Sequence, residues 1–113
     1  MIGSNSTAMV VPMTYSFIVD VPAPIEMYDA THAAVAAAAG TAVDGLLVHV
    51  GRATDTGFQV LEVWESKQHC DRFNETVVGP AMAALTGGQP VPPPPITEIT
   101  VRGLVIPNGG LLI

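Results

Sequence analysis

A carboxylate and the chain's single tryptophan lie two residues apart in the segment Gly57 to Ser66, where alternating polar and apolar residues predict a strand that runs directly into a helix. Residues two apart on a strand point to the same side of a sheet, so we expect Glu62 and Trp64 to share one environment. A strand used only for packing would usually carry Val or Ile at both positions. This face of the strand is therefore our candidate site.

A histidine is expected directly opposite Glu62. Residues 44 to 53 have the pattern of a strand, and Thr54-Asp55-Thr56-Gly57 has the residue types of a tight hairpin turn. If Ala53 faces Phe58, then His49 faces Glu62 and Leu47 faces Trp64. A carboxylate beside an imidazole orients it and raises its basicity, which makes His49 a candidate proton acceptor.

A helix after the first predicted strand, residues 12 to 20, brings further polar groups to the same place. Pro24 favours a helix start, Gly40 favours its end, and one face carries Ile25, Tyr28, His32, Val35 and Ala39. We predict that His49, Glu62 and His32 are catalytic residues. The predicted substrate-binding residues, which would hold a planar ligand, are Tyr28, Trp64, Ser16 and Phe73.

Each candidate also has a plainer interpretation. His32 can be a hydrogen-bonded core residue, His49 with Glu62 can be a cross-strand pair that only stabilises the hairpin, and Trp64 can be core. His32, His49 and Glu62 together would suit iron or zinc, but they lack a short ligand motif, so we predict no metal. Cys70 falls on the apolar stripe of the second helix, which favours a buried, unreactive thiol.

Composition limits the class of protein. The 113 residues fit one domain, which we place at residues 12–106, between a disordered leader at 1–11 and a C-terminal tail at 107–113. The net charge of -6 argues against nucleic acid as a partner, and we expect no transmembrane helix and no membrane partner. One cysteine and no recognisable signal peptide favour the cytoplasm.

The order of predicted elements is strand, helix, strand, strand, helix, strand. The second helix is expected to start after Ser66 and to kink at Gly79-Pro80, and residues 96 to 106 are expected to form the fourth strand. This order predicts an α+β, ferredoxin-like fold: a four-stranded antiparallel sheet with two helices on one face. The second face would carry Leu46, Val48, Val50, Leu61 and Val63. Because 49% of the chain is hydrophobic, we expect that face to be buried in a homodimer.

The run Leu61-Glu62-Val63-Trp64-Glu65-Ser66 entering a helix, together with this element order, resembles the dimeric α+β barrel superfamily and its antibiotic biosynthesis monooxygenase-like domains. The resemblance implies a cavity between sheet and helices and, in some members, oxidation of aromatic polyketides without a cofactor. Haem-degrading relatives are a poor match, because Phe73 and Asn74 stand where their iron-ligating His is expected. The alternative is a non-catalytic ligand-binding or structural dimer of the same fold.

Overall fold

The computed structural model describes residues 14–40, 42–89, 92–106 and 111–112. In chain order the elements are β1 (Tyr15–Val21), α2 (Ile25–Ala39), β2 (Leu46–Thr54), β3 (Gly57–Trp64), α3 (Lys67–Phe73), the π-helix η1 (Asn74–Val78), α4 (Gly79–Leu85), β4 (Thr97–Ile99), β5 (Val105–Ile106) and β6 (Leu111–Leu112). The predicted leader at 1–11 lies outside the described residues. Within the described residues, no helix is long and apolar enough to cross a membrane.

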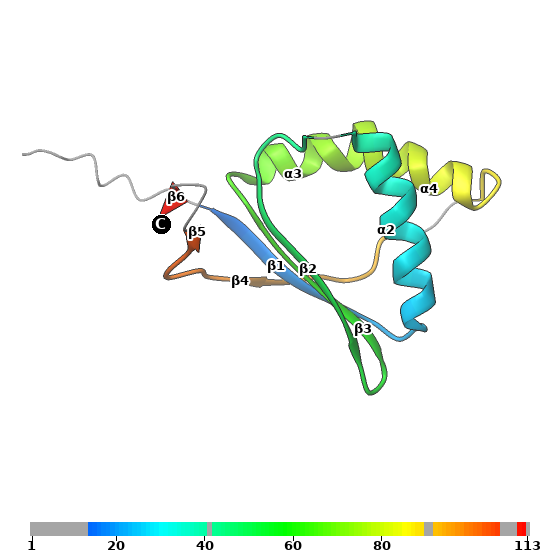
Figure 1. Ribbon diagram of the computed structural model, residues 1–113, viewed down its shortest axis with the longest axis horizontal. Coiled ribbons are helices and arrows are strands. Elements are labelled where there is room, and N and C mark those ends of the chain that lie inside the picture. Colours follow the sequence, from blue (N-terminus) through cyan, green and yellow to red (C-terminus); the bar gives the residue numbers. More distant parts are fainter. Residues whose placement is uncertain (1–13, 41, 90–91, 107–110, 113) are drawn as a thin grey trace, which may run out of the picture.

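The main sheet has the strand order β2-β3-β1-β4, and every neighbouring pair is antiparallel. Helix α2 and the helical run from α3 to α4 lie on the same side of this sheet (Figure 1). The predicted α+β, ferredoxin-like fold is therefore confirmed. Its open second face is the surface that the helices leave uncovered.

The β2–β3 hairpin sets the register of the candidate site. Thr54 pairs with Gly57 and Ala53 with Phe58, and His49 lies opposite Glu62, as the turn residues predict. The prediction for Leu47 is wrong, because Leu46 pairs with Trp64. An irregularity between Leu46 and Val48 inserts an extra residue at the start of β2, so Leu46 turns toward the helices instead of the open face.

The core lies between the sheet and the helices. Phe17, Val19, Trp64 and Cys70 form its buried cluster, and Leu46 and Phe73 pack against it. Alternation along β1 points Phe17 and Val19 toward the helices and Ile18 toward the open face. Trp64, at 1% exposure, is the most completely buried large side chain among the described residues, so it fixes the end of β3 against α3.

The second helical run begins and bends for local reasons. The Ser66 side chain caps it by accepting a hydrogen bond from the backbone N–H of His69 at 3.2 Å. Pro80 has no N–H to donate, and the turn before it widens into a π-helix in which the Gly79 N–H reaches back to the Asn74 carbonyl. The predicted irregularity at Gly79-Pro80 thus takes the form of a π-helical turn.

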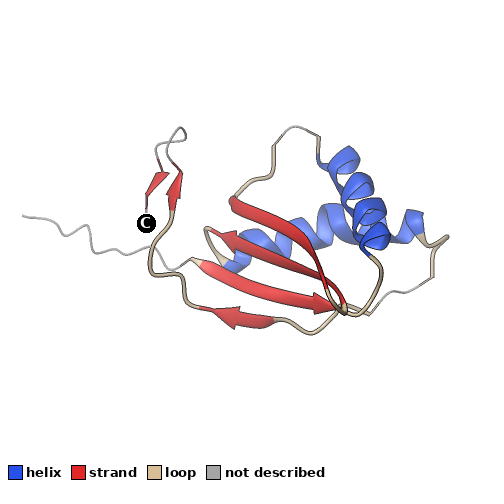
Figure 2. Ribbon diagram, turned by 60° about the horizontal axis from the view of Figure 1, so that its bottom comes forward, coloured by secondary structure: helices blue, strands red, loops and turns tan. Residues whose placement is uncertain are grey.

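The fourth strand is shorter than predicted. Only Thr97–Ile99 pairs with β1. In this register Thr100 would face Tyr15, the first residue of β1, and any longer pairing would need residues that precede the strand. Residues 105–106 instead pair with 111–112 in a small β5–β6 hairpin that stands apart from the main sheet (Figure 2). The predicted tail at 107–113 therefore contains a paired strand at Leu111–Leu112, and its other residues lie outside the described ranges.

Candidate functional site

Glu62 holds two side chains at once. Its Oε2 lies 2.7 Å from Nδ1 of His49 on the neighbouring strand, and its Oε1 accepts a hydrogen bond from Nε1 of Trp64 at 2.8 Å. The first contact follows from the cross-strand register and the second from the two-residue spacing on β3. The indole N–H donates to Oε1, and when the carboxylate is ionised its Oε2 accepts a hydrogen bond from Nδ1 of His49.

Tyr28 extends this arrangement from the helix side. Its hydroxyl lies 2.7 Å from Nε2 of His49, the ring nitrogen that Glu62 leaves free. The Tyr28 ring can reach this position because it lies directly over Gly51, where any Cβ would overlap the ring. Gly51 therefore has a positional role in the site, since a larger residue there would push the phenol away from His49.

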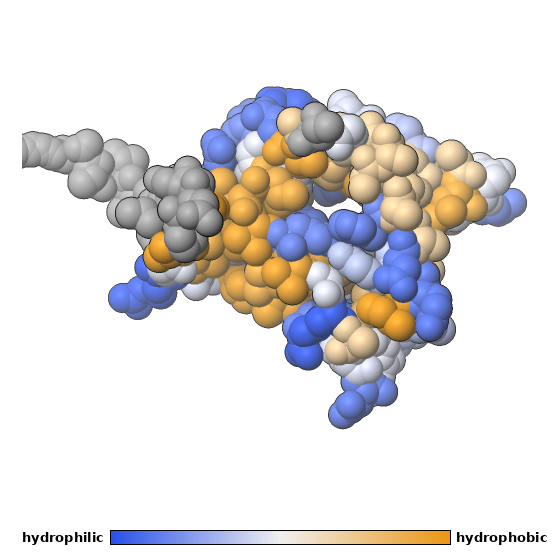
Figure 3. All heavy atoms as spheres, in the orientation of Figure 1, coloured by the Kyte–Doolittle hydropathy of each residue, from blue (hydrophilic) through white to orange (hydrophobic). Residues whose placement is uncertain are grey.

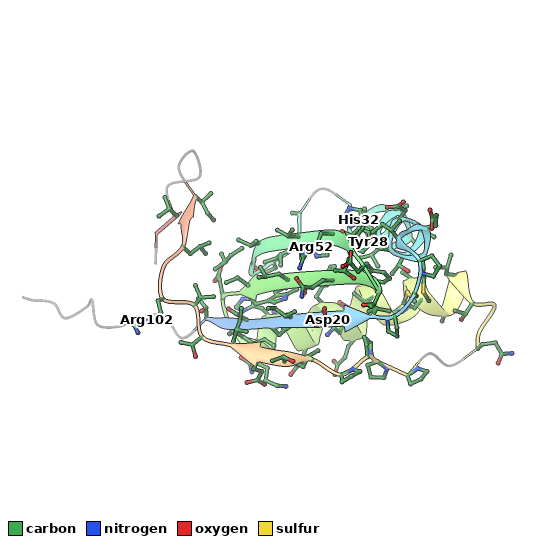
Figure 4. The ribbon with its side chains drawn as sticks, turned by 90° about the horizontal axis from the view of Figure 1, so that it is seen from below. Asp20, Tyr28, His32, Arg52 and Arg102 are labelled. Carbon is green, nitrogen blue, oxygen red and sulfur yellow. The ribbon has the colours of Figure 1, made fainter. Side chains whose placement is uncertain are left out.

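His32 is the outer end of the arrangement. Its Nδ1 lies 3.3 Å from the Tyr28 hydroxyl, and its ring stacks near both Tyr28 and His49, with centroid distances of 5.4 and 5.3 Å. His32 is exposed, whereas we expected it inside a cavity. The helical spacing places it one turn beyond Tyr28, where α2 has passed the edge of the sheet (Figure 4).

These contacts form one continuous chain in which donors and acceptors alternate. With Glu62 ionised, His49 donates through Nδ1 and accepts the Tyr28 proton at Nε2, and the Tyr28 oxygen can accept from His32. The chain runs from an exposed imidazole to a carboxylate whose side chain is 18% exposed. Such a chain can accept a proton at Tyr28 and pass one on to His49.

The phenol of Tyr28 stays protonated at neutral pH. Burial raises the pKa of Tyr28 above its ordinary value of 10.0, and the negative charges of Glu62 and Asp29 raise it further. Tyr28 is therefore suited to relay a proton rather than to hold a negative charge.

The two remaining predicted substrate-binding residues lie in different places. Phe73 packs against Trp64, with ring centroids 5.6 Å apart, and so contacts the buried end of the site. Ser16 does not join the site. It pairs with Val63 on the open face of the sheet, because the alternation that turns Phe17 toward the helices turns Ser16 away from them.

The position of the cavity also differs from the prediction. The space-filling view shows the molecule hollowed between the helices and the sheet (Figure 3). A cavity of about 170 Å³ lies between the end of α2, the loop before β2, and the start of the second helical run. Phe73 lines it, but Tyr28, His32, His49, Glu62 and Trp64 do not. Polar groups at this cavity, Asp44, His69 and Arg72, were not predicted as site residues.

Neither a metal site nor a reactive thiol emerges from the described residues. No group of three or more His, Cys, Asp and Glu among them is placed to hold a metal ion. Cys70 is 3% exposed, and burial, with added effects of Glu62 and Asp71, raises the pKa of its thiol to about 11. The thiolate is therefore scarce at neutral pH, in keeping with an unreactive core thiol.

The fold and the site together define a ferredoxin-like α+β protein with a hydrogen-bonded Tyr-His-Glu-Trp set between sheet and helix. No protein-family model matches the chain, and no curated protein matches it. Among solved structures, it is similar to a monooxygenase from the gene ActVA-Orf6 of Streptomyces coelicolor, determined in complex with the ligand nanaomycin D. The two are 26% identical, and the match covers 83% of this chain and 88% of the other, with a TM-score of 0.36.

Proposed function

We propose that this protein oxidises a small, planar, mostly apolar molecule, aromatic or polyketide-like, with dioxygen and without a cofactor. The observation that carries the proposal is the unbroken chain of hydrogen bonds from Tyr28 through His49 to Glu62, at 2.7 Å for each step. It supplies a base, a carboxylate that stabilises the protonated base, and a neutral phenol at the outer end. These are the parts that proton abstraction from an acidic substrate needs.

The chemistry starts with removal of a proton from a phenol or an acidic ring carbon of the substrate. The proton passes to the Tyr28 oxygen while the Tyr28 proton passes to Nε2 of His49, and Glu62 stabilises the imidazolium. The substrate carbanion then gives one electron to dioxygen, and the substrate radical and superoxide combine into a peroxide anion. This anion takes back the proton from His49 through Tyr28 and becomes a hydroperoxide, which returns His49 to its neutral form. Loss of water leaves a new carbonyl, so one oxygen atom enters the product and the other leaves as water.

The open face of the sheet supports a homodimer as the working form. Ile18, Leu61 and Val50 lie side by side across β1, β3 and β2, and Val50 is 48% exposed in the single chain. On the same face, the Ser16 hydroxyl is buried without a hydrogen-bond partner within the described part of the chain, a state that costs about 1–3 kcal/mol. A second copy would cover the apolar row.

One end of the open face is polar. Arg52 donates to Gln59 at 3.0 Å, and Gln59 donates to Asp20 at 3.0 Å, which ties the three strands together. Figure 4 shows Arg52 and Asp20 on the sheet. We infer that this polar row marks the rim of the dimer interface and the apolar row its centre.

The test of the activity uses 1,8-dihydroxyanthrone, a planar molecule with an acidic carbon, under isotopically labelled dioxygen. We expect the protein to speed its conversion to the anthraquinone well above the buffer rate, with one labelled oxygen atom in each product molecule. The measurements are oxygen uptake and product mass. Binding of the anthrone without acceleration would contradict the enzymatic proposal and favour the non-catalytic ligand-binding alternative.

A further inference from the structure

The cavity next to Phe73 has an apolar wall and a polar edge. Val43, Phe73 and Val77 form the wall, and Asp44, His69 and Arg72 form the edge. Ala39 at the end of α2 and Ala42 in the following loop leave space, because their side chains extend only one carbon from the backbone. The far side of the cavity is built by the π-helical turn, a form of helix that often occurs at functional sites. Its volume of about 170 Å³ suits a molecule of about ten non-hydrogen atoms.

His69 is held rigidly at the edge of this cavity. Gly45, with φ of +83°, brings the backbone against the His69 ring, where no Cβ would fit. The Ser66 hydroxyl lies 2.6 Å from Nδ1 of His69 and already accepts a bond from the His69 backbone N–H. The Ser66 hydroxyl can donate its own proton to Nδ1, and the ring hydrogen then lies on Nε2. In this tautomer His69 presents an N–H donor at the edge of the cavity.

Nε2 of His69 and the guanidinium of Arg72 both lie near the carboxylate of Asp44, but neither forms a hydrogen bond with it. Nε2 of His69 is 3.8 Å and Nη1 of Arg72 is 3.6 Å from the same oxygen of Asp44, and neither distance is a hydrogen bond. Asp44 is 81% exposed, so its side chain can be solvated as the two donors turn to another acceptor. The negative charge of Asp44 beside them opposes a second anion. The arrangement favours a neutral acceptor oxygen.

We propose that this cavity is a binding site for a small, neutral aromatic ketone. The carbonyl oxygen accepts hydrogen bonds from Nε2 of His69 and from the Arg72 guanidinium, and the ring packs between Phe73 and Val77. The site is separate from the Tyr28–His49–Glu62 chain, although Phe73 also contacts Trp64. Its existence does not depend on the proposed oxidation, and it is tested without measuring activity.

The probe is 1-indanone, added to isotopically labelled protein and followed by NMR. We expect saturable shifts at His69, Arg72 and Val77 with a dissociation constant in the millimolar range, as befits about ten non-hydrogen atoms. Indane has the same shape without the carbonyl and should bind about tenfold more weakly, because it leaves both donors unpaired. Equal binding of the two, or shifts confined to other parts of the chain, would overturn the proposal.

Substitutions test whether indanone binds in this cavity or elsewhere on the protein. Arg72→Gln should weaken indanone binding about tenfold and leave the fold intact, since the Arg72 side chain is 60% exposed. Val77→Phe should abolish binding by filling the cavity. The matched control is Arg52→Gln on the open sheet face, which should bind indanone like the unaltered protein. If Arg52→Gln weakened binding as much as Arg72→Gln did, or if indane-1-carboxylate bound more tightly than indanone, the assigned site or ligand class would be wrong.

Discussion

Val50→Glu should convert the proposed homodimer into a monomer at micromolar concentration. Val50 lies at the β2 end of the apolar row on the open face and is its most exposed member, and two-fold symmetry would bury two new carboxylates without partners. Leaving buried charges unpaired costs about 3 kcal/mol or more, which raises the dimer dissociation constant more than hundredfold. Light scattering over a range of concentrations measures the change.

The single chain should tolerate this substitution, because Val50 is already 48% exposed there and β2 is an edge strand. A circular dichroism spectrum like that of the unaltered protein would confirm that the monomer is folded. The control is Ala37→Glu on the exposed side of α2, which should remain dimeric. A monomeric unaltered protein, or a Val50→Glu variant that stays dimeric, would contradict the barrel-like dimer.

His49→Gln should slow oxidation of the anthrone probe by about 10²- to 10⁴-fold. Glutamine can keep a polar contact with Glu62 or Tyr28, but it cannot take up a proton, so the loss reports proton transfer rather than packing. His32→Gln should cost less than about tenfold, since His32 is exposed and its contact with Tyr28 is the longest in the chain at 3.3 Å. Initial rates of oxygen uptake give both values. Similar rates for His49→Gln and the unaltered protein would exclude His49 as the base.

The fold and one half of the site could be predicted because they depend on local signals. The two-residue turn fixes the β2–β3 register, and this alone places His49 opposite Glu62. Helical spacing after Pro24 places Tyr28 on the inward side of α2. The irregularity near Leu46 was not predicted, because Gly45 directly before the strand indicates an unusual backbone but does not determine which residue pairs with Trp64.

The rest of the site depends on how elements pack. A lone glycine inside a strand often marks a close approach of another group, so Gly51 could have predicted that a side chain such as Tyr28 packs against β2 at this point. Ser16 was misassigned although its alternation with Phe17 already placed it on the other face. The exposure of His32 and the position of the cavity depend on the angle between α2 and the sheet, which spacing along the chain does not determine.

The central claim is that Tyr28, His49 and Glu62 act as one connected unit, and the alkaline titration of Tyr28 tests it most directly. In a Tyr15→Phe background, the absorbance of the phenolate reports Tyr28 alone. We predict that the pKa of Tyr28 lies above 10.0 and falls when Glu62→Gln is added, because burial remains but the nearby negative charge is gone. The Asp29→Asn variant is the matched control and should lower the pKa of Tyr28 less, since Asp29 contributes less than Glu62. An identical pKa of Tyr28 with and without Glu62 would contradict the claim.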